Sequence, residues 1–305
     1  MLCTVERMRL GRDAQAILGQ SQIGMLALRA GHSAHGAPLV NPVVFNFASG
    51  SLWMTTSRYA AKTLIAKRDP RAAFLVDSGS RALLLRGAVE VFDPLSVSSQ
   101  VRAMLDGPGY VLGMTGYALK NAPFIAGYVL DLAKLPREWM PYNRIVMRLQ
   151  PSDADVIEGV PFPAAHPARV PAVPAAVSRR LAGVSRGYAC WMEGGMPVIR
   201  PAFWEVDHGQ VTVAPTEGRV RSGSGGALVV ESHHRFRPSL MVGACVRGRF
   251  GAKADAATIA ERYGIEPDDV PDAVDLEPER VTSWSGFTIA TAVPRPARHL
   301  KVAEG

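Results

Sequence analysis

The chain of 305 residues is 48% hydrophobic and carries a formal net charge of +7. A chain of this length buries roughly three quarters of its unfolded surface, so its fold requires neither a disulfide nor a structural metal. The cysteines Cys3, Cys190 and Cys245 are far apart and odd in number, which favours reduced thiols and a cytoplasmic protein. Residues 1–18 carry too many charges for a signal peptide, and no basic helix or aromatic-rich basic face predicts a nucleic-acid partner.

The first half of the chain predicts a β-rich unit with short helices. An amphipathic helix is expected over residues 12–19. The loop before residue 37 holds His32 and His35, but a third metal ligand is not nearby, so we interpret it as a solvated turn. Strands, recognised by their β-branched and aromatic residues, are expected over residues 23–28, 42–47, 52–56, 73–76, 83–91 and 144–149.

A helix is expected directly after residues 52–56, with Ser57 as its N-cap. Thr55, Thr56 and Ser57 would then place three hydroxyl groups at the helix N-terminus, with Arg58 and Lys62 on its first turns. Free backbone N–H groups, the helix dipole, hydroxyl groups and two cations together favour a bound phosphate. An ordinary capped surface helix with solvated cations is the competing interpretation.

The motifs PLVNPVVF, LWMTTS, AKTLIAKRDPRAAFLVD and LRGAVEV follow one another between residues 38 and 91. In this order they resemble the FMN-binding split β-barrel family, which includes pyridoxamine 5'-phosphate oxidase and related flavin and deazaflavin oxidoreductases. The resemblance implies a mainly β (α+β) fold in which Thr55, Thr56 and Lys62 bind the phosphate and the flavin ring lies along residues 41–44. Vitamin-oxidising members carry an arginine at the position of Asn41, so their substrate is not implied here.

The resemblance further implies a flavin-dependent oxidoreductase that transfers hydride to or from a small organic substrate, with FMN as cofactor. Catalytic residues are not identified. Three alternatives stay open: a deazaflavin-dependent reductase, a haem-binding or haem-degrading split barrel that uses His299 or the pair His233-His234, and a non-catalytic flavin carrier. Arg86 is expected to contact the phosphate or to stabilise negative charge on the flavin. The expected cofactor-binding residues are Asn41, Pro42, Val43, Val44, Thr55, Thr56, Ser57, Arg58, Lys62, Thr63 and Arg86.

Residues 107–132 form an apolar stretch that is rich in glycine and aromatic residues. Lys120, Asn121 and Pro123 interrupt it and leave apolar runs far shorter than the roughly 20 residues of a membrane span, so no membrane partner is expected. A buried helical segment is the first expectation. A lid over the flavin ring is the sharper hypothesis, because exposing the aromatic side chains would be costly.

Five prolines between residues 159 and 175 predict a stiff, extended linker. We expect a first split barrel in residues 1–158, with the phosphate helix and the helical excursion, a Pro/Ala-rich linker in residues 159–176, and a second, degenerate barrel in residues 177–305. The sequence from Pro197 to Val213 aligns without a gap on Pro38 to Met54, which indicates a tandem repeat. A chance match between two hairpins is the alternative.

The second copy lacks the predicted phosphate helix. Only 11 residues separate Pro215 from Ala227, where 16 separate Thr56 from Ala73, and they show no helical pattern. Split barrels of this family normally dimerise around the flavin. The resemblance therefore implies a monomer that acts as a pseudo-dimer, with one flavin in the groove between its barrels; further dimerisation stays open.

Overall fold

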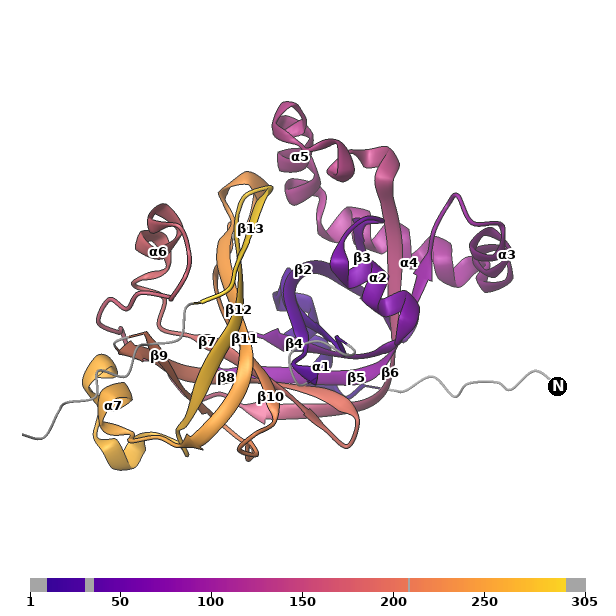
Figure 1. The fold of residues 1–305 in the computed structure, drawn as a ribbon. Helices are drawn as coiled ribbons and strands as arrows, with labels where there is room; N and C mark the ends of the chain where they lie inside the picture. The colour runs from indigo at the N-terminus through magenta and orange to yellow at the C-terminus, as the bar shows by residue number, and fades with distance from the viewer. Residues whose placement is uncertain (1–9, 31–35, 208, 295–305) are drawn as a thin grey trace, which may run out of the picture.

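The computed structural model describes residues 10–30, 36–207 and 209–294. Within them the chain forms two antiparallel β-barrels, with helices at the periphery (Figure 1). The first barrel is closed and has the strand order β1-β2-β3-β6-β5-β4. Its strands are β1 (Ile23–Leu28), β2 (Leu39–Ala48), β3 (Ser51–Ser57), β4 (Arg71–Asp77), β5 (Arg81–Phe92) and β6 (Arg144–Glu158).

The second barrel has the strand order β11-β10-β7-β8-β9-β12, and pairing between β11 and β12 closes it. An additional strand, β13, extends the sheet beyond β12. The strands are β7 (Gly187–Glu193), β8 (Met196–Asp207), β9 (Gln210–Pro215), β10 (Gly225–Ser232), β11 (Val242–Lys253), β12 (Val274–Ser285) and β13 (Thr288–Ala292).

The two barrels share one topology, because β7 to β12 pair with one another as β1 to β6 do. Asn41 in β2 and Arg200 in β8 occupy equivalent positions in the ladders to the preceding strand. The β5–β6 and β11–β12 ladders both carry an irregularity directly after an arginine, Arg86 and Arg247. Such an irregularity is a specific local feature, so its repetition supports duplication. The structure confirms the predicted mainly β fold of two tandem split barrels that form an intramolecular pseudo-dimer.

Alternating side chains fill each barrel and also join the two. Inside the first barrel, the rings of Phe45 and Phe74 meet edge to face at 5.1 Å between centroids. On the other face of the same sheet, Ala27 and Leu75 belong to an apolar cluster that continues into the second barrel and includes Ala202. Burying each large side chain contributes roughly 1.5–3 kcal/mol, so this shared cluster holds the barrels together.

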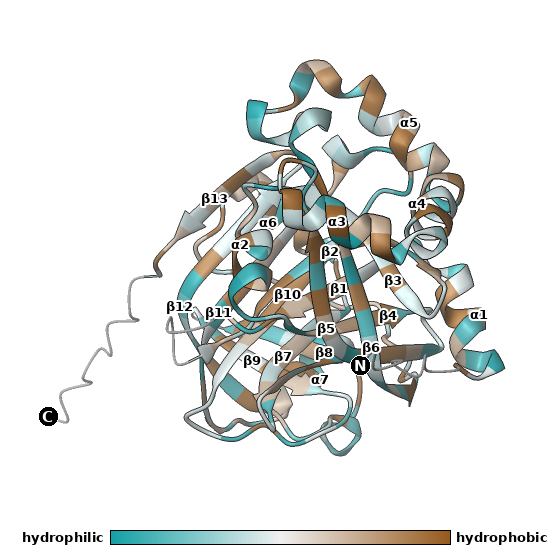
Figure 2. Ribbon diagram, turned by 90° about the vertical axis from the view of Figure 1, so that its right-hand side faces the viewer, coloured by the Kyte–Doolittle hydropathy of each residue, from teal (hydrophilic) through white to brown (hydrophobic). Residues whose placement is uncertain are grey.

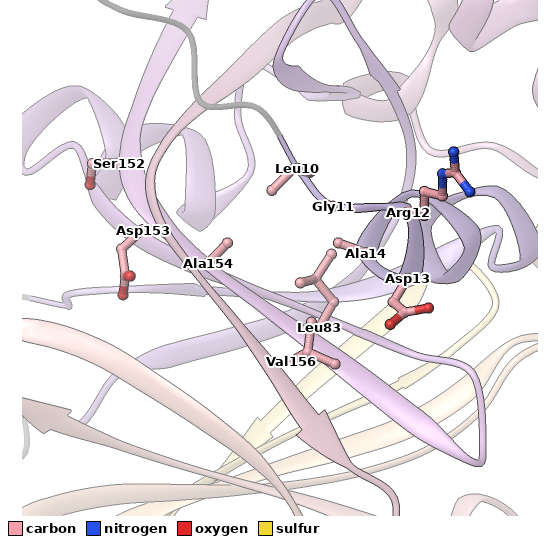
Figure 3. Close-up of a pocket in the computed structure, with 10 residues that line it drawn as sticks. All are labelled: Leu10, Gly11, Arg12, Asp13, Ala14, Leu83, Ser152, Asp153, Ala154 and Val156. Atoms are coloured by element: carbon pink, nitrogen blue, oxygen red, sulfur yellow. The ribbon is translucent and has the colours of Figure 1, made fainter.

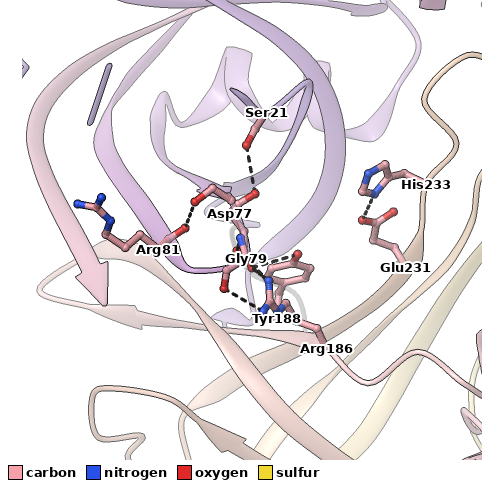
Figure 4. A network of polar contacts seen from close by, with 9 residues as sticks. Ser21, Asp77, Gly79, Arg81, Arg186, Tyr188, Glu231 and His233 are labelled. Carbon is pink, nitrogen blue, oxygen red and sulfur yellow. Dashed lines mark hydrogen bonds and ion pairs between the residues drawn. The ribbon is translucent and has the colours of Figure 1, made fainter. Parts of the chain in front are cut away.

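Polar contacts complete the junction between the barrels. Arg186, just before β7, donates to both carboxylate oxygens of Asp77 at 2.9 Å, and the Tyr188 hydroxyl lies 3.5 Å from the same carboxylate (Figure 4). The end of β4 is thereby bonded to the start of β7. Because burial and the neighbouring Asp77 carboxylate both disfavour the phenolate, the pKa of Tyr188 is raised well above its usual value.

The helices lie between strands and around the barrels. A long helical excursion, α3 to α5, separates β5 from β6 and projects from the first barrel (Figure 1). The helices are α1 (Arg12–Gln20), α2 (Ala61–Arg68), α3 (Val97–Asp106), α4 (Pro108–Lys120), α5 (Ala122–Leu130), α6 (Ala175–Leu181) and α7 (Ala257–Tyr263). In the part of the chain that the structure describes, no helix has the length and apolar character needed to cross a membrane.

Candidate functional site

The predicted phosphate helix exists as α2, but Ser57 is not its N-cap. The helix begins at Ala61, and its N-cap is Ala60, which has no side-chain acceptor. Ser57 lies at the end of β3, where its hydroxyl donates to the carbonyl of Glu138 at 2.5 Å and accepts from the backbone N–H of Tyr59 at 3.2 Å. The prediction of the cap was wrong because a turn, residues 58–60, separates the strand from the helix.

Lys62, on the first turn of α2, is a cation without an acidic partner. Within the described residues it has no hydrogen bond or ion pair. Burial and, to a smaller extent, the positive charge of Arg144 lower the pKa of Lys62 from 10.5 to about 8. The side chain is nonetheless partly exposed, so a ligand can reach it. Lys62 and Arg144 together, without a carboxylate, raise the local positive potential, and a bound anion would lower it.

Arg144 is the second cation of this site. It stands at the first position of β6, directly across the ladder from Ser57. Its Nη2 donates to the carbonyl oxygen of Thr55 at 3.0 Å and to the Thr55 hydroxyl at 2.7 Å. Among the described residues it forms no ion pair with a carboxylate. Thr55 therefore fixes the guanidinium beside Lys62 while leaving its charge uncompensated.

Thr55 lies where the first barrel opens. The ladder between β2 and β3 ends at the pair Phe45 and Met54, so the strands separate beyond it. Tyr117 of α4 covers this opening: its hydroxyl lies 3.2 Å from Thr55 Oγ1, and its ring packs in one cluster with Val44. The candidate site therefore lies at the opening of the first barrel, where the hydroxyl of Thr55 is next to the two cations.

Three other predicted phosphate ligands are turned away from Lys62 and Arg144 or are bonded to other groups. Thr56 is buried and, because side chains alternate along a strand, it faces away from Thr55 and Ser57. Thr63 is fully buried and donates to the carbonyl of Ser57 at 2.7 Å. Arg58 forms an ion pair with Asp93 at 3.2 Å, which neutralises its charge.

Arg86 lies elsewhere. It bonds to Asp153 through Nε at 2.7 Å, and Asp153 follows Arg144 by nine residues along β6. Nine residues of a strand span about 30 Å at ~3.3 Å per residue. The structure therefore does not bring Arg86 to Lys62 and Arg144.

The strand expected to carry the flavin ring is β2. Val43 packs inside the barrel, whereas Val44 packs outside beneath α4. Asn41 and Pro42 are half-buried at the end of β2 that β3 does not pair with. Asn41 and Pro42 belong to the part of β2 beyond the pair of Phe45 and Met54, and Thr55 belongs to the corresponding part of β3.

Three aromatic side chains gather beside Arg144. The guanidinium carbon of Arg144 lies 5.4 Å from the centroid of the Tyr128 ring. Phe287, at the turn between β12 and β13, contacts both Tyr128 and Trp139, with centroids 6.1 and 6.0 Å apart. Phe287 belongs to the second barrel, so both barrels contribute to the surroundings of the cationic site.

The equivalent region of the second barrel has none of these groups. The matched ladders place Ala214 and Pro215 where the first barrel has Thr55 and Thr56. A compact apolar cluster that includes Phe203, Ala214 and Tyr263 occupies this region. The hydroxyl of Tyr263 donates to the carbonyl of Ser185 and accepts from the backbone N–H of Trp204. The second opening is filled by protein.

A sizeable cavity lies apart from the cationic site. It measures about 500 Å³ and lies between the start of α1 and the outer half of β6, where Asp13, Leu83 and Asp153 line it (Figure 3). It contains no arrangement of hydroxyls and unpaired cations like that around Lys62. Volume alone therefore does not identify the functional site.

The histidines named as haem ligands are engaged or lie outside the described residues. His233 Nδ1 lies 3.0 Å from Glu231, whose carboxylate raises the pKa of His233 (Figure 4). His234 Nδ1 accepts two backbone N–H groups. His32, His35 and His299 lie outside the described residues. Within the described ranges no cluster of His, Cys, Asp and Glu could hold a metal ion.

No protein-family model and no curated protein matches the chain. Three solved structures that resemble it are named as flavin or deazaflavin proteins. An F420 reductase is 19% identical over 48% of this chain and 98% of its own, with a TM-score of 0.31. An FAD-binding protein from Mesorhizobium loti is 13% identical, with coverages of 50% and 96% and a TM-score of 0.35. A pyridoxamine 5'-phosphate oxidase-related, FMN-binding protein from Nostoc punctiforme is 16% identical, with coverages of 48% and 83% and a TM-score of 0.33.

Each of these neighbours covers about half of the chain, which is the length of one barrel unit. The strand order of the two barrels, and not these neighbours, defines the class of the fold, which is a tandem pair of split β-barrels.

Proposed function

We propose that the chain binds one phosphate-bearing flavin, FMN, at Lys62, Arg144 and Thr55, and that it acts as an oxidoreductase on a small organic molecule. The observation that carries the proposal is the pair of cations without a carboxylate, held beside a hydroxyl at the opening of the first barrel. A phosphate dianion supplies the missing negative charge and accepts hydrogen bonds from all three groups.

The protein's own groups would bind, orient and exclude water. Lys62 and Arg144 balance the phosphate charge, and Thr55 holds Arg144 in place. The half-buried end of β2 supports the ring, as the sequence resemblance implies. A bound flavin supplies hydride transfer, and the protein sets its position and its access to water.

The groove between the barrels is the proposed place of reaction. Residues 1–158 and 177–305 form the two halves in this proposal, joined by residues 159–176. Support comes from Phe287, which brings the second barrel to the aromatic side chains beside Arg144. Tyr128 and Trp139 would wall the substrate pocket together with Phe287.

Titration of the purified protein with FMN, followed by flavin absorbance and fluorescence, tests the assignment. Lys62→Gln should weaken binding by about 1.5–3 kcal/mol, or ten- to a hundredfold, because it removes a charge-assisted hydrogen bond. Lys67→Gln is the matched control, because Lys67 lies on the same helix but pairs with Asp93 at 3.3 Å. Equal affinities of the two variants would contradict the proposal.

A deazaflavin is the second candidate, because its phosphate would meet the same donors. Mass spectrometry of the cofactor released from the purified protein distinguishes it from FMN. Anaerobic reduction of the loaded protein, followed by a screen of organic acceptors, distinguishes a reductase from a flavin carrier. Reoxidation by at least one acceptor is the outcome expected of a reductase.

A further inference from the structure

The helical excursion has an exposed apolar face on α3. Its exposed residues are spaced by four, three and one positions, so they lie on one side of the helix. They are Val97, Val101, Met104 and Leu105, which are 49–82% exposed. The opposite side of the helix carries the buried Ser99. This exposed face precedes residues 107–132, the segment that the sequence predicts to be buried.

The next two helices repeat this arrangement. α4 contacts the barrel through small residues: a Cβ atom on Gly113 would lie 2.2 Å from the ring of Trp53. Its outer side carries Val111, Leu112 and Leu119, which are 60–74% exposed. α5 likewise exposes Val129 and Leu130. Three successive helices thus expose apolar side chains, and the prediction that residues 107–132 are buried is wrong for these positions. Figure 2 shows hydrophobic (brown) segments along the ribbons of these helices.

Exposed apolar residues on three helices in succession indicate an interaction site, because exposed apolar residues of a monomer are usually scattered singly. Its charges indicate the partner. Between residues 94 and 137 the only carboxylates are Asp106 and Asp131, and both are largely buried in ion pairs, with Arg148 and Arg237.

The charged groups that remain accessible in this segment are cations, and one exposed carboxylate, Glu138, follows it directly. Arg102 and Arg137 are exposed, and the side chain of Lys134 is 63% exposed. Apolar side chains surrounded by cations are the composition of helices that lie in the surface of an anionic bilayer. A second copy of the chain would instead place like charges opposite one another across a two-fold interface.

We propose that the outer face of α3, α4 and α5 binds the surface of an anionic lipid bilayer without crossing it. The helices lie in the interface with their exposed leucine and valine side chains among the lipid chains, and the cations contact the headgroups. α4 and α5 also carry Tyr117 and Tyr128, so the bilayer surface would lie close to the cationic site. The sequence did not predict this partner, because its apolar runs are too short to span a membrane and binding at a bilayer surface requires no such span.

Vesicle flotation of the full chain tests the proposal. The protein should float with vesicles of equal parts phosphatidylcholine and phosphatidylglycerol and should remain unbound with pure phosphatidylcholine. Leu105→Glu and Leu112→Glu should each reduce the bound fraction by about tenfold, because each places a carboxylate among lipid chains. High salt should weaken the binding of the unaltered protein.

Val293→Glu is the matched control, because Val293 is 73% exposed but lies outside the excursion. It should leave flotation unchanged, and all three variants should melt at the temperature of the parent protein. Failure of the parent to float with either vesicle would overturn the proposal. A stable dimer by light scattering, which Leu105→Glu but not Val293→Glu converts to a monomer, would overturn it in favour of a second copy.

Discussion

At the scale of single residues, Lys62 and Arg144 are two neighbouring cations that the folded protein holds without a carboxylate between them. Burial and mutual repulsion lower the pKa of Lys62 to about 8, from the value of 10.5 that a free lysine has. The free-energy cost of burying the charge of Lys62 beside that of Arg144 is tolerated because the rest of the barrel is well packed. A bound anion reverses the balance, because it favours the protonated amine.

This coupling predicts a pH dependence of anion binding. Phosphate binds the protonated form of Lys62, so the affinity for FMN should be highest between about pH 7 and pH 8, where the phosphate is a dianion, and should fall as the pH rises above it. Fluorescence titrations between pH 7 and 10 measure the affinity. The weak binding that Lys62→Gln retains should not fall in this window. The same decline in both proteins would show that another group is responsible.

The hydroxyl cluster shows what the residues alone could and could not predict. Thr55 was predicted beside Arg58 and Lys62, because three hydroxyls before a helix are visible in the sequence, whereas the cation that it bonds in the structure is Arg144. The alternation of side chains along β3 turns Thr56 to the other face, which the sequence pattern did not take into account. Arg144 was not identified as a ligand because it is 89 residues away from Thr55 and meets it only through the pairing of β3 with β6.

At the scale of elements, α4 packs closely on the first barrel because its contact residue, Gly113, has no side chain. Gly113 allows the helix to lie against the ring of Trp53, where a Cβ atom would lie only 2.2 Å from it. Asn121, fully buried after the helix, donates to the carbonyl of Phe45 and holds the end of α4 against β2. The position of Tyr117 over Thr55 depends on both contacts.

Gly113→Ala is therefore expected to displace α4. The overpacking against Trp53 should cost about 1–3 kcal/mol of stability and should weaken FMN binding, because Tyr117 moves with the helix. Gly19→Ala in α1 is the control, because no atom lies within 4 Å of its added Cβ. Urea unfolding measures the stability of both variants. Equal midpoints would show that the α4 contact is adaptable.

Strands were predicted well where their side chains are apolar and poorly where they are polar. β1 was predicted with its observed bounds, Ile23–Leu28, and all six of its residues are buried. β6 continues to Glu158, although only residues 144–149 were predicted, because its outer half has the exposed sequence that begins Pro151-Ser152-Asp153. Backbone pairing with β5 extends this strand without any apolar alternation that a sequence pattern could detect.

At the scale of the whole molecule, Asp131 links the excursion to the second barrel. Its buried carboxylate accepts from Arg237 and from the backbone N–H of Ser239, and the hydrogen bond from Arg237 holds the pKa of Asp131 below its usual value of 3.8. The stability that this contact provides is present above about pH 4 and is lost as the pH falls through the lower pKa of the folded protein.

Asp131→Asn should thus lower the melting temperature at pH 7, because it leaves Arg237 without its anion. The difference from the parent protein should shrink as the pH is lowered below 4, because the unfolded parent chain then takes up a proton at Asp131 and the folded protein does so only at its lower pKa. Asp272→Asn is the control, because Asp272 pairs with Lys253 at an exposed position. A difference in melting temperature that does not change with pH would contradict the role of the carboxylate charge.

The duplication itself predicts how many flavins one chain binds. Both barrels have the same strand order, but among the described residues the cations without a carboxylate partner are at the opening of the first. The equivalent region of the second is filled by Phe203, Ala214 and Tyr263, and its cation, Arg262, pairs with Glu205 at 3.2 Å. We therefore expect one FMN per chain, measured by flavin absorbance against protein concentration from amino-acid analysis. Because the single site depends on Lys62, the Lys62→Gln variant should lose its only tight flavin rather than half of the total. Two flavins per parent chain, with one retained in the variant, would show that the second barrel binds phosphate through groups other than those of the first.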